Sequence, residues 1–162
     1  SPAVLEQLGL AAALRQLVRR FQQVYPCRLG LYLDSLAGLS KPVETVVYRL
    51  VQECCNNIAK HSQARNVNIS VRQADGILRV EVEDDGVGFS VEEALARTGS
   101  YGLTGMRERV TLLGGVLRIE SPCALNGRRR TQPFGSRIVA ELPVSSSSRR
   151  VSERRIDEDK DR

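Results

Sequence analysis

Apolar positions recur at helical spacing in three parts of the chain. Between residues 4 and 24, apolar side chains repeat at i, i+4, i+7, i+8 and i+11, which predicts a first amphipathic helix. A second helix is predicted over residues 40–61, with Ser40 as a suitable N-cap. A third is predicted from about residue 101 to 113, where two glycines follow the last apolar position. These helices supply one layer of the predicted fold.

Alternation of apolar and polar residues predicts the strands. It is clearest over residues 66–73 and 77–84, which a hairpin turn at Ala74, Asp75 and Gly76 would join. Shorter runs predict three more strands, at residues 28–33, 116–120 and 136–142. Together these patterns predict three helices and about five strands, mostly antiparallel. They indicate an α+β fold, namely a two-layer α/β sandwich with three helices on one face of a mixed sheet.

Two stretches lack these patterns. Residues 86–105 are rich in glycine and small polar residues, and we expect most of them to form a mobile connection without a packed element. Residues 145–162 are serine-rich and then of mixed charge with almost no apolar residue, so we expect a disordered tail. The predicted organisation is one domain over residues 1–144, followed by that tail.

Composition narrows the function classes. The net charge of +5 suits a polyanionic ligand such as a nucleotide, while 4% aromatic residues and no Trp disfavour a single-strand nucleic-acid platform. Four cysteines without C-x-x-C spacing and one histidine disfavour a zinc site and fit a reducing cytosol. No apolar run approaches about 18 residues, so no membrane span is predicted. Because the chain begins with Ser and lacks a signal peptide, we expect a fragment or a processed chain.

Three polar residues of the second predicted helix form a row. Glu53, Asn57 and Lys60 stand at i, i+4 and i+7, and therefore share one helix face. A carboxylate, a carboxamide oxygen and an ammonium form a useful set for handling a metal-bound phosphate. A solvated polar face explains the row equally well.

Two polar residues are in phase with the apolar face of the predicted sheet. Asp84 follows apolar alternate positions, and a buried carboxylate is costly unless a partner satisfies it. Beside Gly86 and Gly88 it would make a good acceptor for an exocyclic amine such as that of adenine, although a simple strand-end turn is the alternative. Ser136 also faces inward, where a serine bonded to the backbone is the more common case.

Glycines before the third helix suggest an anion site, because free amides at a helix N-terminus attract anions. Glycine before a helix is often only a connection, so this feature is weak alone. Other nucleotide-binding motifs are missing from the sequence: the P-loop, the third glycine of a dinucleotide fingerprint and the eukaryotic-type protein kinase signatures.

Four stretches follow one another along the chain: Glu53-x-x-x-Asn57-x-x-Lys60-His61, Asp84-Asp85-Gly86-Val87-Gly88-Phe89, Gly102-Leu103-Thr104-Gly105-Met106-Arg107-Glu108-Arg109 and Gly135-Ser136-Arg137. Each is weak alone, but their order makes them specific jointly. They closely resemble the N-box and glycine boxes of sensor histidine kinases, members of the GHKL ATPase superfamily that also includes gyrase and mismatch-repair ATPases. The Gly-Leu-x-Gly-Met-x-Glu-Arg motif and the short lid resemble those of the nitrate-sensor and desaturase-sensor subfamily. The resemblance covers roughly residues 2–144 and implies the Bergerat-type ATP-binding fold.

The resemblance implies ATP and Mg²⁺ as cofactors and a role for each matched residue. Glu53 would be catalytic, as the base or as the group that polarises the phosphate-accepting histidine. Asn57 would hold the Mg²⁺. The other matched residues would contact the nucleotide: Lys60 and His61 at the phosphates, Asp84 at the adenine amine, Gly86 and Gly88 beside the base, Gly102, Leu103 and Gly105 in the lid around the triphosphate, and Ser136 near the adenine.

The resemblance also implies the reaction and the partners. The chain would be the catalytic domain of a protein-histidine kinase, transferring the γ-phosphoryl group of ATP to a histidine on a dimerisation hairpin that this sequence lacks. That hairpin and a response regulator are the expected partners, with no nucleic acid. The chain alone is expected to be monomeric, within a homodimeric parent. The domain is expected to be cytoplasmic, and the parent cytoplasmic or anchored in the inner membrane.

Three alternatives remain open from the sequence. An anti-sigma-factor-type serine kinase shares the same boxes, and a nucleotide-sensing module would bind ATP without transferring phosphate. A nucleic-acid-binding module would use the arginines at residues 128–130, in a connection longer than the family's usual turn, together with the tail. The acidic residues interspersed in the tail argue against the last of these.

Overall fold

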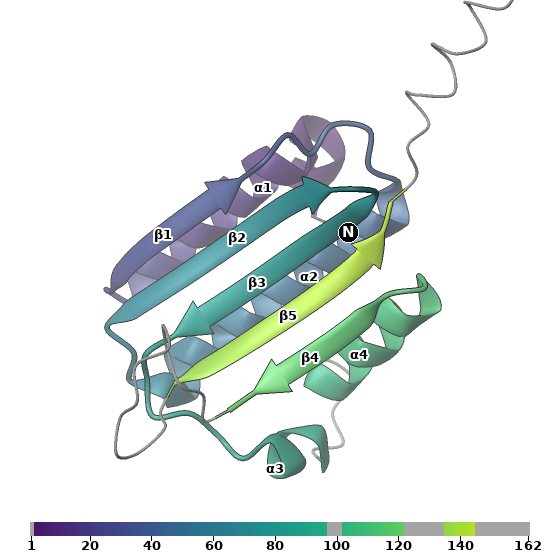
Figure 1. The fold of residues 1–162 in the computed structure, drawn as a ribbon. Helices are drawn as coiled ribbons and strands as arrows, with labels where there is room; N and C mark the ends of the chain where they lie inside the picture. The colour runs from purple at the N-terminus through teal and green to yellow at the C-terminus, as the bar shows by residue number, and fades with distance from the viewer. Residues whose placement is uncertain (1, 97–101, 122–134, 145–162) are drawn as a thin grey trace, which may run out of the picture.

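Helices pack on one face of a mixed five-stranded sheet (Figure 1). The computed structural model describes residues 2–96, 102–121 and 135–144. The α+β fold and the mixed sheet predicted from the sequence are confirmed. The elements follow one another as α1 (Ala3–Val24), β1 (Arg28–Leu33), α2 (Lys41–Asn57), η1 (Ile58–Ser62), β2 (Asn66–Ala74), β3 (Ile77–Asp84), α3 (Val91–Ala96), α4 (Leu103–Leu112), β4 (Val116–Glu120) and β5 (Ser136–Pro143).

The strand order in the sheet is β1-β2-β3-β5-β4. β1 pairs with β2 in parallel, and the other three neighbouring pairs are antiparallel. A hairpin turn joins β2 to β3 at the predicted place, but it is two residues long, because Ala74 still pairs with Ile77. The backbone φ is positive at both turn residues, Asp75 (53°) and Gly76 (75°). Both central residues of a type I′ turn require positive φ, and Asp-Gly is a favoured pair for this turn. The turn fixes the register of the two strands.

The helix ends are set by local signals read from the sequence. The Val43 amide donates to the Ser40 side chain over 3.3 Å, so Ser40 caps α2 as predicted. At the end of α4, Gly114 has a φ of 79°, and the Gly115 amide donates to the Val110 carbonyl over 2.9 Å. This arrangement satisfies carbonyl groups that a helix end would otherwise leave unpaired.

The core lies between the helices and the facing side of the sheet. Alternate residues of the central strands are buried against α2, as the period of a half-buried strand requires. Asp84, the last residue of β3, and Ser136, the first residue of β5, keep this phase, and the register pairs them directly. Figure 1 shows that α2 ends beside these strand ends. The fold therefore brings two polar strand ends to the C-terminal end of one helix.

The opposite face of the sheet carries an ion-pair ladder. The Arg137 Nε lies 3.1 Å from a carboxylate oxygen of Glu81 and 3.2 Å from one of Glu83. Each such partly exposed pair stabilises the fold by less than about 1 kcal/mol. The ladder nevertheless favours the β3–β5 register that places Ser136 opposite Asp84.

Two predicted helices are not continuous. Gly9 interrupts α1 with a φ of 83° and a ψ of 176°, a conformation that essentially only glycine adopts. The second predicted helix, expected to run unbroken to His61, is α-helical only to Asn57 and then widens into the single π-helical turn η1. Periodicity read from the sequence does not resolve a one-turn change of pitch.

Most of residues 86–105 are predicted to lack a packed element, and the structure places one short helix, α3, within this segment. Thr104 of α4 donates to the Leu95 carbonyl over 2.7 Å, and Leu95 packs against the core. The sequence of α3 contains strong helix formers, glutamate, alanine and leucine, but the surrounding glycines obscured it. The predicted tail (145–162) and the arginines at 128–130 lie outside the described residues. Within the described residues, each helix is too short or too polar to span a bilayer.

Candidate functional site

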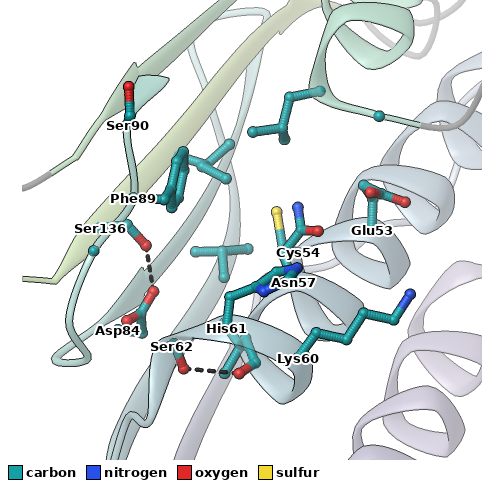
Figure 2. Close-up of a pocket in the computed structure, with 16 residues that line it drawn as sticks. Glu53, Cys54, Asn57, Lys60, His61, Ser62, Asp84, Phe89, Ser90 and Ser136 are labelled. Carbon is teal, nitrogen blue, oxygen red and sulfur yellow. Dashed lines mark hydrogen bonds between the residues drawn. The ribbon is translucent and has the colours of Figure 1, made fainter. Parts of the chain in front are cut away.

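A cavity of about 270 Å³ opens where α2, η1, the end of β3, the start of β5 and the start of α4 meet (Figure 2). The segments that line it come from distant parts of the sequence. The lining residues are Glu53, Cys54, Asn57, Ile58, Lys60, His61, Ser62, Val82, Asp84, Gly88, Phe89, Ser90, Gly102, Leu103, Ser136 and Ile138.

The structure brings most of the predicted site residues to this one cavity. Those that line it are Glu53, Asn57, Lys60, His61, Asp84, Gly88, Gly102, Leu103 and Ser136. Gly86 and Gly105 do not line it. Gly86 packs instead against the backbone of Ser62, where an added Cβ would overlap the Ser62 carbonyl. The roles assigned to these residues remain predictions.

One end of the cavity is apolar around a buried carboxylate. Asp84 is 3% exposed, and its Oδ1 accepts a hydrogen bond from the Gly86 amide at 2.9 Å. The Ser136 hydroxyl donates a short hydrogen bond to Oδ2 (Figure 2). Burial raises the pKa of Asp84, while the bonds from Ser136 and Gly86 oppose that shift. A carboxylate fixed in this way can accept a further hydrogen bond from a ligand amine.

The next carboxylate in the sequence, that of Asp85, joins two strand ends through hydrogen bonds. Asp85 Oδ1 accepts from the backbone amides of Arg65 and Asn66, each at 2.9 Å, and Oδ2 accepts from the Asn66 side chain at 2.7 Å. Burial alone would raise the pKa of Asp85, but these hydrogen bonds outweigh burial and lower it. Asp85 thus fastens the turn after β3 to the start of β2, and Asp84 is left to face the cavity.

Asp85→Ala is expected to lower the free energy of unfolding at pH 7 by about 1–2 kcal/mol, because the lost bonds are partly exposed to water. The folded-state pKa lies below the ordinary value of 3.8, so this stability is present above that pH and is lost as the pH falls through the folded-state pKa. Urea unfolding at several pH values measures both effects. A difference between wild type and variant that persists unchanged at acidic pH would contradict this role.

The other end of the cavity is polar. Glu53, Asn57 and Lys60 come from successive turns of the α2–η1 segment (Figure 2), as the predicted row requires. Glu53 is half-buried; burial raises its pKa, and the nearby Lys60 ammonium opposes the shift. A raised pKa moves a carboxylate toward the range in which it can take up and release a proton.

Several lining residues carried no usable signal in the sequence. Cys54, Ile58, Val82 and Ile138 occupy core phases, so their periodicity predicts burial but cannot separate a cavity wall from ordinary packing. Phe89 is placed by its amide, which donates to the Ser121 hydroxyl over 2.7 Å. That contact spans 32 residues of sequence and has no local signature.

Comparison with known proteins identifies a family model that covers most of the chain. The model described as histidine kinase-, DNA gyrase B-, and HSP90-like ATPase matches residues 43–146. The chain is 39% identical over 121 residues to the sensor histidine kinase ComP of Bacillus subtilis, covering 74% of this chain and 16% of the relative. It is 36% identical over 121 residues to the oxygen sensor histidine kinase NreB of Staphylococcus carnosus, covering 74% and 35%.

Solved structures agree on the fold. The histidine kinase domain of the blue-light activated histidine kinase from Erythrobacter litoralis EL346 superposes with a TM-score of 0.66 at 20% identity, covering 86% of this chain and 63% of that one. At this identity the likeness shows the fold alone. The chain spans well under half the length of these curated relatives.

Proposed function

Because the chain belongs to the family of histidine kinase-, DNA gyrase B- and HSP90-like ATPases, we propose that its cavity binds Mg²⁺-ATP and that it is the catalytic part of a sensor histidine kinase. In this proposal a histidine on a dimerisation hairpin, supplied from outside the chain, receives the γ-phosphoryl group, and a response regulator acts downstream. The named relatives are sensor histidine kinases, as the resemblance read from the sequence predicts.

One observation carries the proposal. A single cavity has a buried carboxylate in an apolar pocket at one end and a carboxylate, an amide and an ammonium at the other. Nucleotides have the matching chemistry, with a flat apolar base that carries an amine and a polyanionic chain at the other end. The base would lie among Val82, Phe89 and Ile138, and its amine would donate to Asp84.

The polar end fits a magnesium ion that arrives with its nucleotide. Mg²⁺ is usually held by one or two protein oxygens together with substrate phosphates, and dedicated all-protein cages are uncommon for it. The amide oxygen of Asn57 would supply one ligand. Among the described residues no group of three acidic, histidine or cysteine side chains forms a cage of its own. When bound, the ion would neutralise phosphate charge.

The residues of this chain would act mainly by positioning and charge. Lys60 would pair with phosphate oxygens, and the Gly102 amide lies at the start of α4, where a helix N-terminus favours an anion. Glu53 would accept a proton from, or polarise, the histidine that attacks the γ-phosphorus. The bond between the γ-phosphorus and the bridging oxygen would break, with ADP as the leaving group, and a new P–N bond would form to the imidazole of the histidine.

Asn57→Ala is expected to abolish the gain in ATP affinity that Mg²⁺ provides, because the substitution removes the proposed protein ligand of the ion. Calorimetric titration with ATP, with and without Mg²⁺, measures this gain directly. Asn56→Ala is the matched control, since Asn56 is the exposed neighbour on α2 and does not line the cavity. Equal Mg²⁺ dependence in the two variants would remove Asn57 from the metal site.

A further inference from the structure

The buried polar residues of the described part of the chain, Ser62, Asp84 and Ser136, all line the cavity. The sequence motifs assign roles to the last two and none to Ser62. Ser62 is 7% exposed and ends the π-helical turn η1. Its hydroxyl donates to the Ile58 carbonyl over 2.8 Å and accepts from the Ala64 amide at 3.0 Å. Both hydrogen-bonding functions of the side chain are therefore used to hold this turn together.

The backbone of Ser62 forms a second contact, with the glycine turn after β3. The Ser62 carbonyl accepts a hydrogen bond from the Val87 amide at 2.7 Å. Gly86 packs so closely on the same carbonyl that a Cβ there would overlap it. The end of η1 and the turn that follows Asp84 are thus docked on each other through one residue.

The two ends of the cavity depend on Ser62 to different degrees. Lys60 and His61 belong to η1, and the chain leaves that turn through Gln63 in the left-handed region at a φ of 55°. This conformation is uncommon for a residue other than glycine, so the surrounding contacts must hold it. The Ser62 hydroxyl bridges the residues on either side of this strained position. Loss of the hydroxyl would remove both side-chain hydrogen bonds that hold the end of η1 in this conformation.

The base end has independent supports. Asp84 and Ser136 are partners in the β3–β5 register, and the backbone pairing of these two strands holds both. Their mutual hydrogen bond does not pass through Ser62. Asp84 also accepts a hydrogen bond from the Gly86 amide, and Gly86 packs on Ser62, but on its backbone carbonyl and not on its hydroxyl. Loss of the hydroxyl alone should therefore move the phosphate-binding groups while the carboxylate and hydroxyl at the base end stay in place.

We infer that Ser62 is a positioning residue, which sets the phosphate-binding turn η1 at a fixed distance from the base-binding end of the cavity. The inference rests on the proposed function and extends it. ATP must reach both ends at once, so its affinity depends on that distance, whereas adenosine uses only the base end.

Ser62→Ala is expected to weaken Mg²⁺-ATP binding by about tenfold, because two buried hydrogen bonds are lost and the turn shifts. Adenosine affinity should change by less than about twofold, since its contacts are on the sheet. The ratio of the two affinities, measured by calorimetry, is a readout that general destabilisation would not move selectively. Ser62→Thr keeps a hydroxyl that can bond the carbonyl four residues earlier, and should restore the wild-type ratio. Ser70→Ala, on the face of β2 away from the cavity, is the matched control.

Equal losses for ATP and adenosine in Ser62→Ala would overturn the inference and leave Ser62 as a core hydrogen-bonding residue. If Ser62→Ala does not fold, Ser62→Cys decides the question, because the thiol fills the space of the hydroxyl but is a weaker donor and acceptor, so it should produce the same selective loss. An unchanged ratio in Ser62→Cys would then overturn the inference. A wild-type chain that fails to bind ATP would overturn the proposed function and this inference together.

Discussion

Glu53→Gln is expected to slow phosphoryl transfer by about 10²-fold or more while nucleotide affinity changes little. Glutamine keeps the shape of the side chain but removes its charge and its basicity. In the proposed mechanism Glu53 acts on the incoming histidine and not on ATP, so binding and chemistry should separate at this position. The half-buried position of Glu53 in the cavity wall, with a pKa raised by burial, supports its assignment as the base.

The measurement needs the acceptor histidine. This chain alone should bind ATP but incorporate no phosphate, whereas a fusion to a phosphoacceptor hairpin should label itself. Phosphate incorporation and a binding titration on the same fusion then give rate and affinity for each variant. Glu44→Gln, in the first turn of α2, is the control for loss of a helix carboxylate outside the cavity. Wild-type transfer by Glu53→Gln would place the base elsewhere.

Asp84→Asn is expected to weaken ATP binding about tenfold or more, because the amide presents a donor where the adenine amine also donates. The carboxylate is held by the Gly86 amide and the Ser136 hydroxyl, which limits its freedom to turn away from the mismatch. The same loss should appear with adenosine, since the contact is to the base. Phosphate-end variants such as Asn57→Ala should leave adenosine affinity unchanged.

Asp75→Asn provides the matched control for this substitution. Asp75 lies in the hairpin at the opposite end of β3, at a φ of 53°, which asparagine tolerates well. It should bind ATP as the wild type does. Calorimetry on the two variants compares one charge change inside the cavity with one outside it. Equal affinities for ATP would remove Asp84 from the binding site.

The sequence predicted the parts of this fold that local chemistry determines. The Asp-Gly turn, the Ser40 cap and the alternation along β2 and β3 each depend on residues close in the chain, and all are confirmed. The inward direction of Asp84 followed from the same alternation, since the side-chain period of a strand is two. The pattern of the strand was therefore sufficient to place a hydrogen-bond acceptor at the apolar face of the sheet.

The remaining features depend on contacts between distant segments. The π-helical turn arises where Ser62 meets Val87, and the periodicity of α2 does not encode that contact. The apolar wall of the cavity looks the same in sequence as the core that continues behind it. For these features the residue types are visible in the sequence, but their arrangement depends on tertiary packing.

The most direct test of this cavity as the ATP site is a titration of the chain with a non-hydrolysable Mg²⁺-ATP analogue. The titration is monitored by the NMR chemical shifts of the backbone amides. We expect saturable binding, with the largest shifts at residues that line the cavity, such as 57, 58, 60–62, 84, 88–90, 102, 103 and 136. Residues on the opposite face of the sheet, such as Arg79, Arg118 and Glu141, should shift little. Absence of saturable binding, or shifts confined to that opposite face, would contradict the assignment of this cavity as the ATP site.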